Sequence, residues 1–247
     1  MALLELQGIT KTFGGIKALD DVNIAVKENT LLGIIGPNGS GKTTLVNTVS
    51  GFIKPDQGKV LFKGKETTGF PPYRVANMGI GRTFQMVKPF SHLPAFKNLI
   101  VPLSSRRVRS QAGGGYGDKD AIALDVLEEV GFERDSSVPY KTASVLPHGY
   151  LKRLELARLI AMKADLFVLD ELFSGLSIAE VTSIIPIIQK ILKEGKTVIM
   201  VEHRLKELFR IADKVIVLNF GKKIKEGLPK EIMEDEEVRR AYLGVEV

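Results

Sequence analysis

The chain has 247 residues, a formal net charge of +6 and no cysteine. Its length suits one large α/β domain or two small ones, and the lack of cysteine excludes disulfides and thiolate metal sites. No stretch reaches the about 18 uncharged apolar residues of a membrane span, and residues 1–10 lack the pattern of a secretory signal, so we expect a soluble chain.

Short apolar runs separated by turn residues predict strands in the first third of the chain. The runs occupy residues 3–9, 20–26, 31–36 and 58–64. The third run leads into a glycine-rich turn and then into a helical pattern over residues 42–52. The sequence therefore predicts a strand, a tight turn and a helix in direct succession.

The middle of the chain is predicted to be helical with long loops. Helical periodicity marks residues 119–131 and 150–163. Positive charge gathers only in residues 104–117, where glycines predict a mobile loop and not a helix that reads a nucleic-acid groove. Elsewhere basic and acidic residues are interspersed, which predicts a solvated surface, so we expect no direct nucleic-acid partner.

Apolar strands return in the last third, over residues 165–170, 196–203 and 214–221. Helical segments lie between them, which predicts parallel strands joined by crossovers, and their continuous Val, Ile and Leu content indicates burial. One of these helices is predicted to begin at Ser177, with Glu180 at the spacing of a capping box. The predicted fold class is α/β.

Residues 36–43 match the phosphate-loop pattern G-x-x-x-x-G-K-[ST] at every position. Glycines let successive backbone N–H groups turn inward around a phosphate, and the following helix directs its positive end at the same anion. We expect Lys42 to meet the β- and γ-phosphates and the Thr43 hydroxyl to ligate Mg²⁺. An ordinary glycine-rich turn is the alternative, but the predicted strand and helix on either side favour a nucleotide site. The predicted nucleotide-binding residues are Gly36, Pro37, Asn38, Gly39, Ser40, Gly41, Lys42, Thr43 and Thr44.

An acidic pair, Asp170 and Glu171, ends the apolar run at 165–170. Asp170 suits the coordination of Mg²⁺ through a water molecule. Glu171 is placed to orient and deprotonate a water that attacks the γ-phosphate. A solvated pair at a helix start is the alternative, and the phosphate loop elsewhere in the chain favours the catalytic interpretation.

Three single residues complete the predicted site. His203 ends an apolar strand at the same sheet edge as Asp170, where it could sense a γ-phosphate, although a lone histidine is commonly structural. Gln85 could contact the metal or the attacking water. Phe13 could stack on the base of the nucleotide, or it could simply pack near its turn.

In chain order these features resemble the ATP-binding subunits of ABC transporters. Phe13, Gln85 and His203 correspond to the A-loop, Q-loop and H-loop of that family, and residues 36–43 to its Walker A motif. Residues 166–171 correspond to Walker B with the catalytic glutamate, and Leu146-Pro147-His148-Gly149-Tyr150 to the signature motif.

The resemblance implies one ABC ATPase domain over residues 1–247, with the P-loop NTPase fold. Its nucleotide-binding core, RecA-like with an antiparallel β-subdomain, is expected over 1–85 and 161–222. An inserted helical subdomain is expected over 86–160 and a C-terminal segment over 223–247. The implied cofactors are ATP and Mg²⁺.

Finer features, GRTFQ, NLIV, LKRLELAR, VEHRL and RAYLG, are similar to the ATPase subunits of branched-chain amino acid importers. Such subunits work in pairs on transmembrane permease subunits, which receive solute from an extracytoplasmic solute-binding protein. The resemblance implies a peripheral location on the cytoplasmic face of the cell membrane. The ATPases of urea transport and lipopolysaccharide export look similar and remain alternatives.

Family members form head-to-tail dimers, in which one subunit's signature meets the ATP of the other. Of the usual L-S-G-G-Q, this chain keeps Leu146 and Gly149, which the resemblance assigns to contacts in trans. Pro147 replaces the serine whose hydroxyl would contact the γ-phosphate, and His148 replaces a glycine. A heterodimer would confine this weakened half-site to one ATP, so a related second ATPase is the expected partner.

The leading hypothesis is an ATP-hydrolysing motor subunit of an importer for branched-chain or related amino acids. A soluble ABC ATPase clamp of translation, chromosome or cofactor assembly is the alternative from another class. A regulatory subunit that barely hydrolyses ATP is a third possibility, which the signature favours and the presence of Glu171 and His203 opposes.

Overall fold

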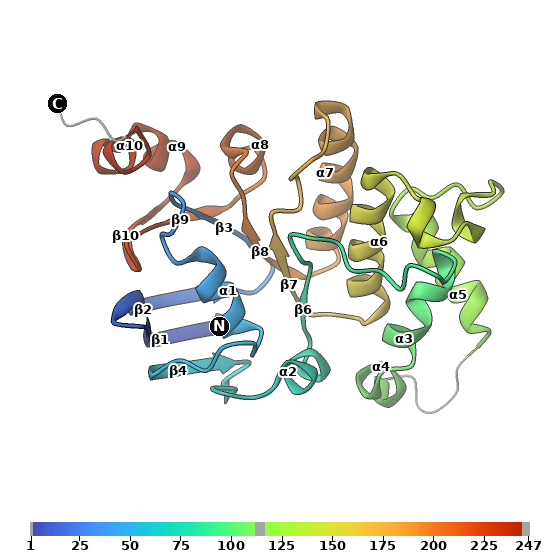
Figure 1. Ribbon diagram of the computed structural model, residues 1–247, viewed down its shortest axis with the longest axis horizontal. Helices are drawn as coiled ribbons and strands as arrows, with labels where there is room; N and C mark the ends of the chain where they lie inside the picture. The colour runs from blue at the N-terminus through green and yellow to red at the C-terminus, as the bar shows by residue number, and fades with distance from the viewer. Residues whose placement is uncertain (1, 112–116, 244–247) are drawn as a thin grey trace.

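The computed structural model describes residues 2–111 and 117–243. A six-stranded sheet forms its centre, and an antiparallel sheet and a group of helices flank it (Figure 1). The six-stranded sheet has the order β10–β9–β3–β8–β7–β6. Its strands are β3 (Leu31–Ile35), β6 (Ile80–Arg82), β7 (Leu166–Asp170), β8 (Thr197–Val201), β9 (Lys214–Asn219) and β10 (Lys222–Gly227).

Five of these strands run parallel, and only β10 pairs antiparallel, with β9. The second sheet is antiparallel with the order β2–β1–β4–β5. Its strands are β1 (Ala2–Phe13), β2 (Ile16–Lys27), β4 (Gln57–Phe62) and β5 (Lys65–Glu66). The predicted parallel strands and the α/β class are confirmed.

Helices join and cover the strands. They are α1 (Lys42–Val49), α2 (Pro72–Met78), α3 (Ile100–Leu103), α4 (Arg106–Gln111), α5 (Lys119–Glu129), α6 (His148–Ala161), α7 (Ile178–Lys193), α8 (Leu205–Phe209), α9 (Pro229–Glu234) and α10 (Glu236–Leu243). Short 3₁₀ turns lie at Phe96–Leu99, Val138–Tyr140 and Ala143–Val145. Among the described residues, no helix is both long and apolar enough to cross a bilayer.

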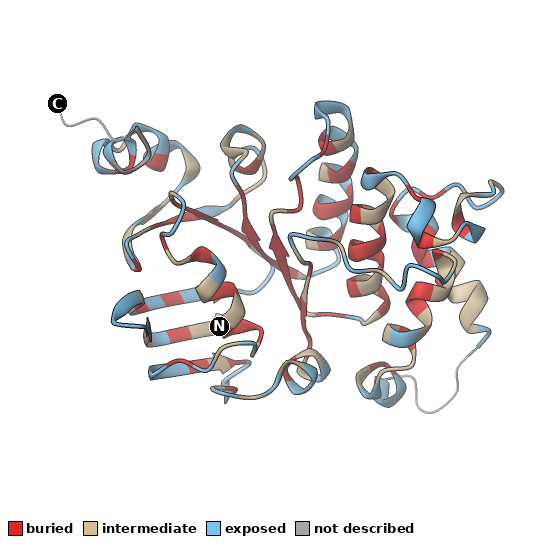
Figure 2. Cartoon of the chain, in the orientation of Figure 1, coloured by how far each residue is buried: buried red, intermediate tan, exposed pale blue. Residues whose placement is uncertain are grey.

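The parallel strands serve two cores because successive side chains point to opposite faces of a sheet. On β7, Phe167 and Leu169 pack with α5, α6 and α7, whereas Leu166 and Val168 pack with α1 and the antiparallel sheet. Every residue of β7 is therefore buried, as Figure 2 shows for the central strands. This double burial explains why the strand sequences read as continuous apolar runs.

Two expectations about local structure have clear outcomes. The capping box of α7 is present: Ser177 Oγ accepts from the Glu180 N–H at 3.2 Å, and Glu180 Oε2 accepts from the Ser177 N–H at 2.7 Å. The loop expected over 104–117 is wrong in part, since α4 forms there. Residues 112–116 of that predicted loop, and 244–247 of the predicted C-terminal segment, lie outside the described residues.

Three strands were not predicted. β5 and β6 are too short for a periodic signal. β10 reads KKIKEG and is largely polar, because it closes one edge of the sheet and needs no second apolar face.

Candidate functional site

The phosphate loop joins β3 to α1 and lies close to two neighbouring strands. Gly36 has φ 157°, and a Cβ there would clash with the backbone oxygen of Leu218 on β9. Gly41, the N-cap of α1, has φ 105°, and a Cβ there would clash with the backbone oxygen of Ala18 on β2. The motif's first and last glycines are thus required by tertiary packing as well as by the loop itself.

The start of α1 has several features of an anion site. No side chain caps the helix and its first turn holds no acidic residue, so its N–H groups and positive dipole end are available to a ligand. Thr43 is exposed in that first turn. The buried Ser40 hydroxyl oxygen finds no hydrogen-bond partner within the described part of the chain. An oxyanion in the loop would satisfy such a group.

Lys42 supplies the positive charge of the loop. Its Nζ donates to the backbone oxygens of Gly36 at 2.7 Å and Pro37 at 2.9 Å. Burial lowers the pKa of Lys42, while the charges of Glu171 and Asp170 act in the opposite direction. The ammonium therefore lies between the phosphate loop and the acidic end of β7.

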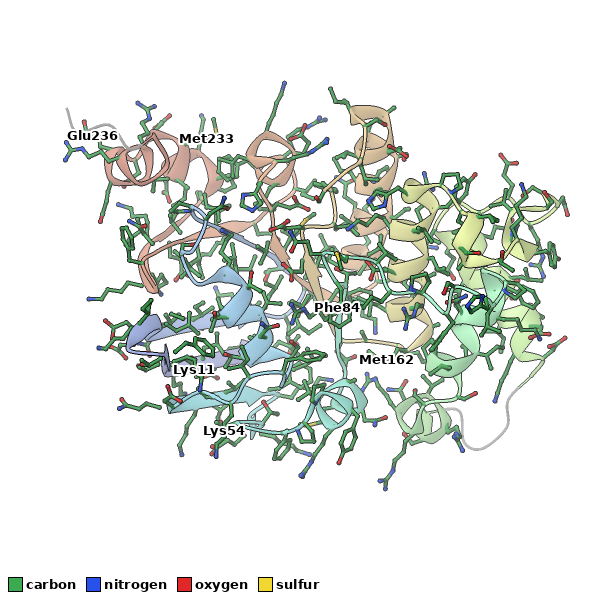
Figure 3. The ribbon with its side chains drawn as sticks, in the orientation of Figure 1. Lys11, Lys54, Phe84, Met162, Met233 and Glu236 are labelled. Carbon is green, nitrogen blue, oxygen red and sulfur yellow. The ribbon has the colours of Figure 1, made fainter. Side chains whose placement is uncertain are left out.

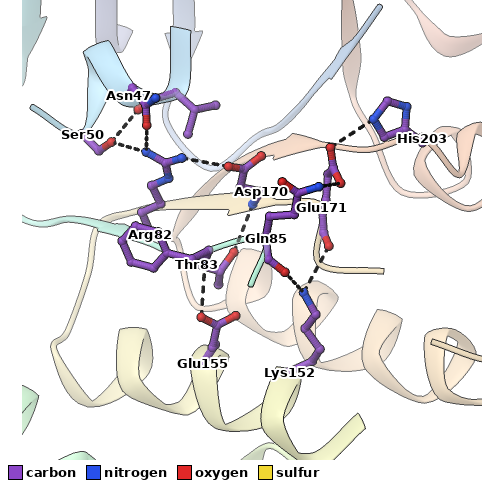
Figure 4. A network of polar contacts seen from close by, with 12 residues as sticks. Asn47, Ser50, Arg82, Thr83, Gln85, Lys152, Glu155, Asp170, Glu171 and His203 are labelled. Atoms are coloured by element: carbon purple, nitrogen blue, oxygen red, sulfur yellow. Dashed lines mark hydrogen bonds and ion pairs between the residues drawn. The ribbon is translucent and has the colours of Figure 1, made fainter. Parts of the chain in front are cut away.

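Asp170, the last residue of β7, is fixed by Arg82, which lies in the stretch GRTFQ but had no predicted role. Arg82 Nη2 donates to Asp170 Oδ2 at 2.8 Å, and both side chains are only 7% exposed. Arg82 Nη1 donates to Asn47 Oδ1 of α1 at 2.6 Å and to Oγ of Ser50, the C-cap of that helix, at 2.9 Å (Figure 4). One guanidinium thus ties β6, β7 and α1 together around the predicted metal side of the site.

Glu171, Gln85 and His203 come together at this edge of the sheet. Gln85 Nε2 donates to Glu171 Oε2 at 2.8 Å, and His203 Nε2 lies 3.1 Å from Glu171 Oε1 (Figure 4). Glu171 has φ 49°, and its N–H donates to the Val201 oxygen of β8 at 2.9 Å. Two residues that are far apart in sequence, Gln85 and His203, therefore flank the carboxylate of a third, Glu171.

Three buried charged residues, Lys152, Glu155 and Glu202, lie beneath this group; the stretches LKRLELAR and VEHRL contain them, but no role was predicted for any of them. Lys152 donates from Nζ to the backbone oxygens of Gln85 and Glu171. Burial raises the pKa of Glu155 and of Glu202 to about 7 in each case. A signal existed: Lys152 and Glu155 stand at helical spacing with the apolar residues of the buried face of α6.

The start of α6 has the unusual sequence Leu146-Pro147-His148-Gly149. Leu146 is buried in the core, and Pro147 is the N-cap, with no side-chain capping bond. His148 Nε2 lies 3.2 Å from the Ser174 backbone oxygen. A Cβ on Gly149 would clash with Glu180 Oε1 of the α7 capping box.

Phe13 ends β1 at the turn of the β1–β2 hairpin. Its ring is about half exposed, and Lys11 Nζ lies 5.3 Å from the ring centroid. Phe13 pairs in register with Ile16, and Ala18, slightly further along β2, is the residue that approaches Gly41. The exposed ring therefore belongs to the hairpin end nearest the phosphate loop.

Two hollows adjoin the site. A groove of about 400 Å³ lies between α2 and β6 on one side and α3 and α6 on the other, with Phe84 and Met162 on its walls (Figure 3). A second hollow of about 440 Å³ lies on the outer side of the phosphate loop and is lined also by Glu237 and Arg240 of α10. Within the described ranges no group of three or more His, Cys, Asp or Glu side chains could hold a metal ion.

Comparison with known proteins identifies the architecture. The family model described as "ABC transporter" matches residues 19–174. The chain belongs to this family. As an ABC ATPase, it hydrolyses ATP and couples that reaction to transport. A second model, described as "Branched-chain amino acid ATP-binding cassette transporter", matches residues 222–247 at the end of the chain.

Similar proteins cover the ABC ATPase over its full length. The probable branched-chain amino acid transport ATP-binding protein LivG of Archaeoglobus fulgidus is 34% identical, across 100% of this chain and 97% of its own. The high-affinity branched-chain amino acid transport ATP-binding protein BraF of Pseudomonas aeruginosa is 33% identical, across 98% of each chain. The lipopolysaccharide export ATP-binding protein LptB of Haemophilus influenzae is 30% identical, across 99% of this chain and 98% of its own.

Solved structures show the same fold. The ADP conformation of MJ1267, an ATP-binding cassette of an ABC transporter, aligns with a TM-score of 0.86 at 30% identity, over 99% of this chain and 100% of that one. A dimeric bacterial ABC transporter cassette, MJ0796, aligns with a TM-score of 0.79 at 26% identity, over 92% and 98%. The predicted P-loop NTPase fold of this ABC ATPase is confirmed.

Proposed function

We propose that the chain powers an importer for branched-chain or related amino acids by hydrolysing ATP. The names of its relatives and the family match at residues 222–247 support this solute class. The observation that carries the hydrolytic role is the Glu171 carboxylate, held between Gln85 and His203 beside the phosphate loop. Glu171 and His203 are the proposed catalytic residues.

Glu171 acts as the general base in this proposal. Its carboxylate takes a proton from the attacking water, and the Gln85 amide and His203 ring keep it aligned until that water binds. A positioned general base typically contributes about 10²- to 10⁴-fold to a rate. Lys42, the N–H groups of the loop and the start of α1 stabilise the negative charge of the phosphates.

Mg²⁺ fits the residues present. Thr43 offers a hydroxyl, Gln85 an amide oxygen, and Asp170 a carboxylate oriented by Arg82, with contact through a water molecule in the last case. Mg²⁺ prefers few protein ligands and keeps several waters and substrate phosphates, so these three residues suffice as its protein ligands. When bound, the ion neutralises phosphate charge; Thr43, Gln85 and Asp170 orient it.

The remaining nucleotide contacts follow from the loop and the hairpin. Asn38, Ser40 and Thr44 belong to the loop and the first turn of α1, where backbone and hydroxyl groups suit phosphate oxygens. Phe13 offers an exposed ring for stacking on adenine.

A second, related ABC ATPase completes each ATP site in this proposal, with a heterodimer favoured. Gly149 and the uncapped start of α6 present N–H groups and a helix dipole to the partner's ATP, and buried Leu146 anchors that start. Pro147 offers no hydroxyl there. A better signature on the partner then serves the phosphate loop of this chain.

Transmembrane permease subunits are the other proposed partners, and an extracytoplasmic solute-binding protein acts through them. The groove beside Phe84 supports this role, because it lies next to Gln85 and between the core (1–85 and 161–222) and the proposed helical subdomain (86–160). Docking there places the chain peripherally, on the cytoplasmic face of the membrane. The proposed C-terminal segment from 223 onward begins within β10, the edge strand of the central sheet, and continues into α9 and α10.

The test uses the chain assembled with its membrane subunits. Glu171→Gln should bind nucleotide with unchanged affinity but lose ATP turnover by about 10²-fold or more, since the amide cannot accept the proton. Exposed Glu194 on the end of α7 supplies the control, and Glu194→Gln should turn over normally. Unchanged turnover in Glu171→Gln would remove Glu171 as the base, and transport of an unrelated solute class would refute the proposed cargo.

The pairing proposal has its own test. ATP turnover of the purified chain is compared with that of a mixture with a related ATPase that has an intact signature. We expect the mixture to be faster, and Pro147→Ser with His148→Gly to raise the rate of the chain alone. Efficient hydrolysis at both sites of a pure homodimer would contradict the asymmetric pairing.

A further inference from the structure

One lysine links the two backbone segments that carry Gln85 and Glu171. Lys152 lies on α6 and is 0% exposed. Its Nζ donates to the backbone oxygen of Gln85 at 3.2 Å and to that of Glu171 at 3.3 Å (Figure 4). The side chains of Gln85 and Glu171 also bond to each other, so three contacts close a small ring of interactions.

A buried ammonium is costly unless its surroundings replace water. Around Lys152 the two carbonyl oxygens do this, and the carboxylates of Glu155, Glu202, Glu171 and Asp170 add favourable charge. Burial still lowers the pKa of Lys152. A purely structural position on this face of α6 would be served by an apolar residue, as at Leu156 and Leu159.

The position of Lys152 on α6 connects the start of that helix with the segments that carry Gln85 and Glu171. α6 begins at His148, and Lys152 lies one turn later on the same rigid element. His148 stands at the helix start proposed to face the ATP of the partner subunit. Lys152 reaches the catalytic carboxylate of its own subunit through the Glu171 backbone. A shift of α6 would therefore change the distances from Lys152 Nζ to the backbone oxygens of both Gln85 and Glu171.

We propose that Lys152 is a positioning residue for ATP hydrolysis, which sets the spacing of Gln85 and Glu171 and couples it to the start of α6. This inference rests on the proposed function, since it needs Glu171 as the base. Lys152 does not touch the nucleotide. Its effect is on the alignment of the carboxylate that meets the attacking water, where a misplacement of about 1 Å can cost about 10²-fold in rate.

The experiment measures kcat, KM and nucleotide affinity in the complete transporter with both ATPases and the membrane subunits. Lys152→Met keeps most of the side-chain volume but cannot donate a hydrogen bond. We expect its kcat to fall about tenfold or more, while KM and nucleotide affinity stay within about twofold, because the phosphate loop is untouched. Lys152→Arg keeps the donors and should recover most of kcat.

The controls separate this inference from the proposed function. Lys193→Met, at an exposed position of α7, should leave all three quantities unchanged. If Glu171→Gln retains normal turnover, the proposed function fails. If Glu171→Gln is inactive but Lys152→Met keeps kcat within about twofold, only the role of Lys152 fails.

A merely structural role has a different signature. Parallel losses of kcat, affinity and melting temperature in Lys152→Met, with no recovery in Lys152→Arg, would overturn the proposal. Should Lys152→Met not fold, Lys152→Gln takes its place, because an amide can supply only part of the lysine's contacts. A kcat equal to that of the unmodified chain in Lys152→Gln would also overturn the proposal.

Discussion

The starts of α1 and α6 both lack a side-chain cap, but different groups pack against them. The N-caps are Gly41 and Pro147, neither helix has a side-chain capping bond, and neither first turn holds an acidic residue. α7, by contrast, has a complete capping box from Ser177 and Glu180. Uncapped N–H groups and the positive dipole end suit both starts to anions, although at the start of α6 the Glu180 carboxylate already lies beside Gly149.

The neighbours of the two starts differ in rigidity. At Gly41 the nearest obstacle to a Cβ is the backbone of β2, which cannot move without disturbing the sheet. At Gly149 the obstacle is the carboxylate end of Glu180, and at Gly175 it is the ring of His148. The α1 start is thus a rigid site for the ATP that we propose it binds. The α6 start is adjustable, which suits its proposed contact with the ATP of a partner subunit.

The largest effect on stability is expected at Gly41, at the start of α1. Gly41→Ala should lower the free energy of unfolding by about 2–4 kcal/mol, because the methyl group meets backbone and φ is 105°. Nucleotide affinity should fall with it. Denaturant unfolding and titration with a fluorescent nucleotide measure the two effects.

Gly39→Ala is the matched control for Gly41→Ala. Gly39 also has positive φ, at 77°, but no atom lies within 4 Å of its Cβ position. Only the conformational cost remains, about 1–2 kcal/mol. Equal losses in the two variants would show that the β2 backbone does not constrain the loop.

A smaller effect is expected where His148 meets the loop before α7. Gly175 has φ 75°, and a Cβ there would lie 3.0 Å from His148 Nε2. Gly175→Ala should cost about 1–2 kcal/mol, mostly from φ. In the His148→Ala background the loss should shrink by about 0.5 kcal/mol, which a double-mutant cycle measures. Strict additivity would mean that the ring moves away freely.

The smallest effect is expected at Gly149. Its added methyl group pushes against the Glu180 carboxylate, so the loss is limited to part of the capping box, less than about 1 kcal/mol. The better helix propensity of alanine offsets about 0.5–1 kcal/mol of it. In the Glu180→Ala background Gly149→Ala should be neutral or stabilising. A loss as large as that of Gly41→Ala would erase the distinction between the two helix starts.

Local sequence patterns predicted most of the central strands of the fold. The apolar runs of β3, β7, β8 and β9 identified the central strands because each is buried on both faces. The polar strand β10 was not predicted, since an edge strand does not need to be buried on both faces. The prediction of a loop was wrong for Arg106–Gln111, since these residues form α4 despite their positive charge.

The residues of the site were also predictable only in part. The residue types of the phosphate loop and of Asp170 and Glu171 are short motifs, visible without coordinates. The contacts among Gln85, Glu171 and His203 join segments from three parts of the chain. Motif order suggested that they share a site, but not which atoms meet.

The sequence by itself determined features that a short segment records, whatever their physical cause: the phosphate-loop glycines, the apolar strands and the capping box from Ser177 to Glu180. Only the tertiary structure decided the partners of the buried charges. Arg82 pairs with Asp170, and Lys152 joins the backbones of Gln85 and Glu171. A charged side chain is buried only where distant segments converge to supply its hydrogen bonds, and no short pattern records that convergence.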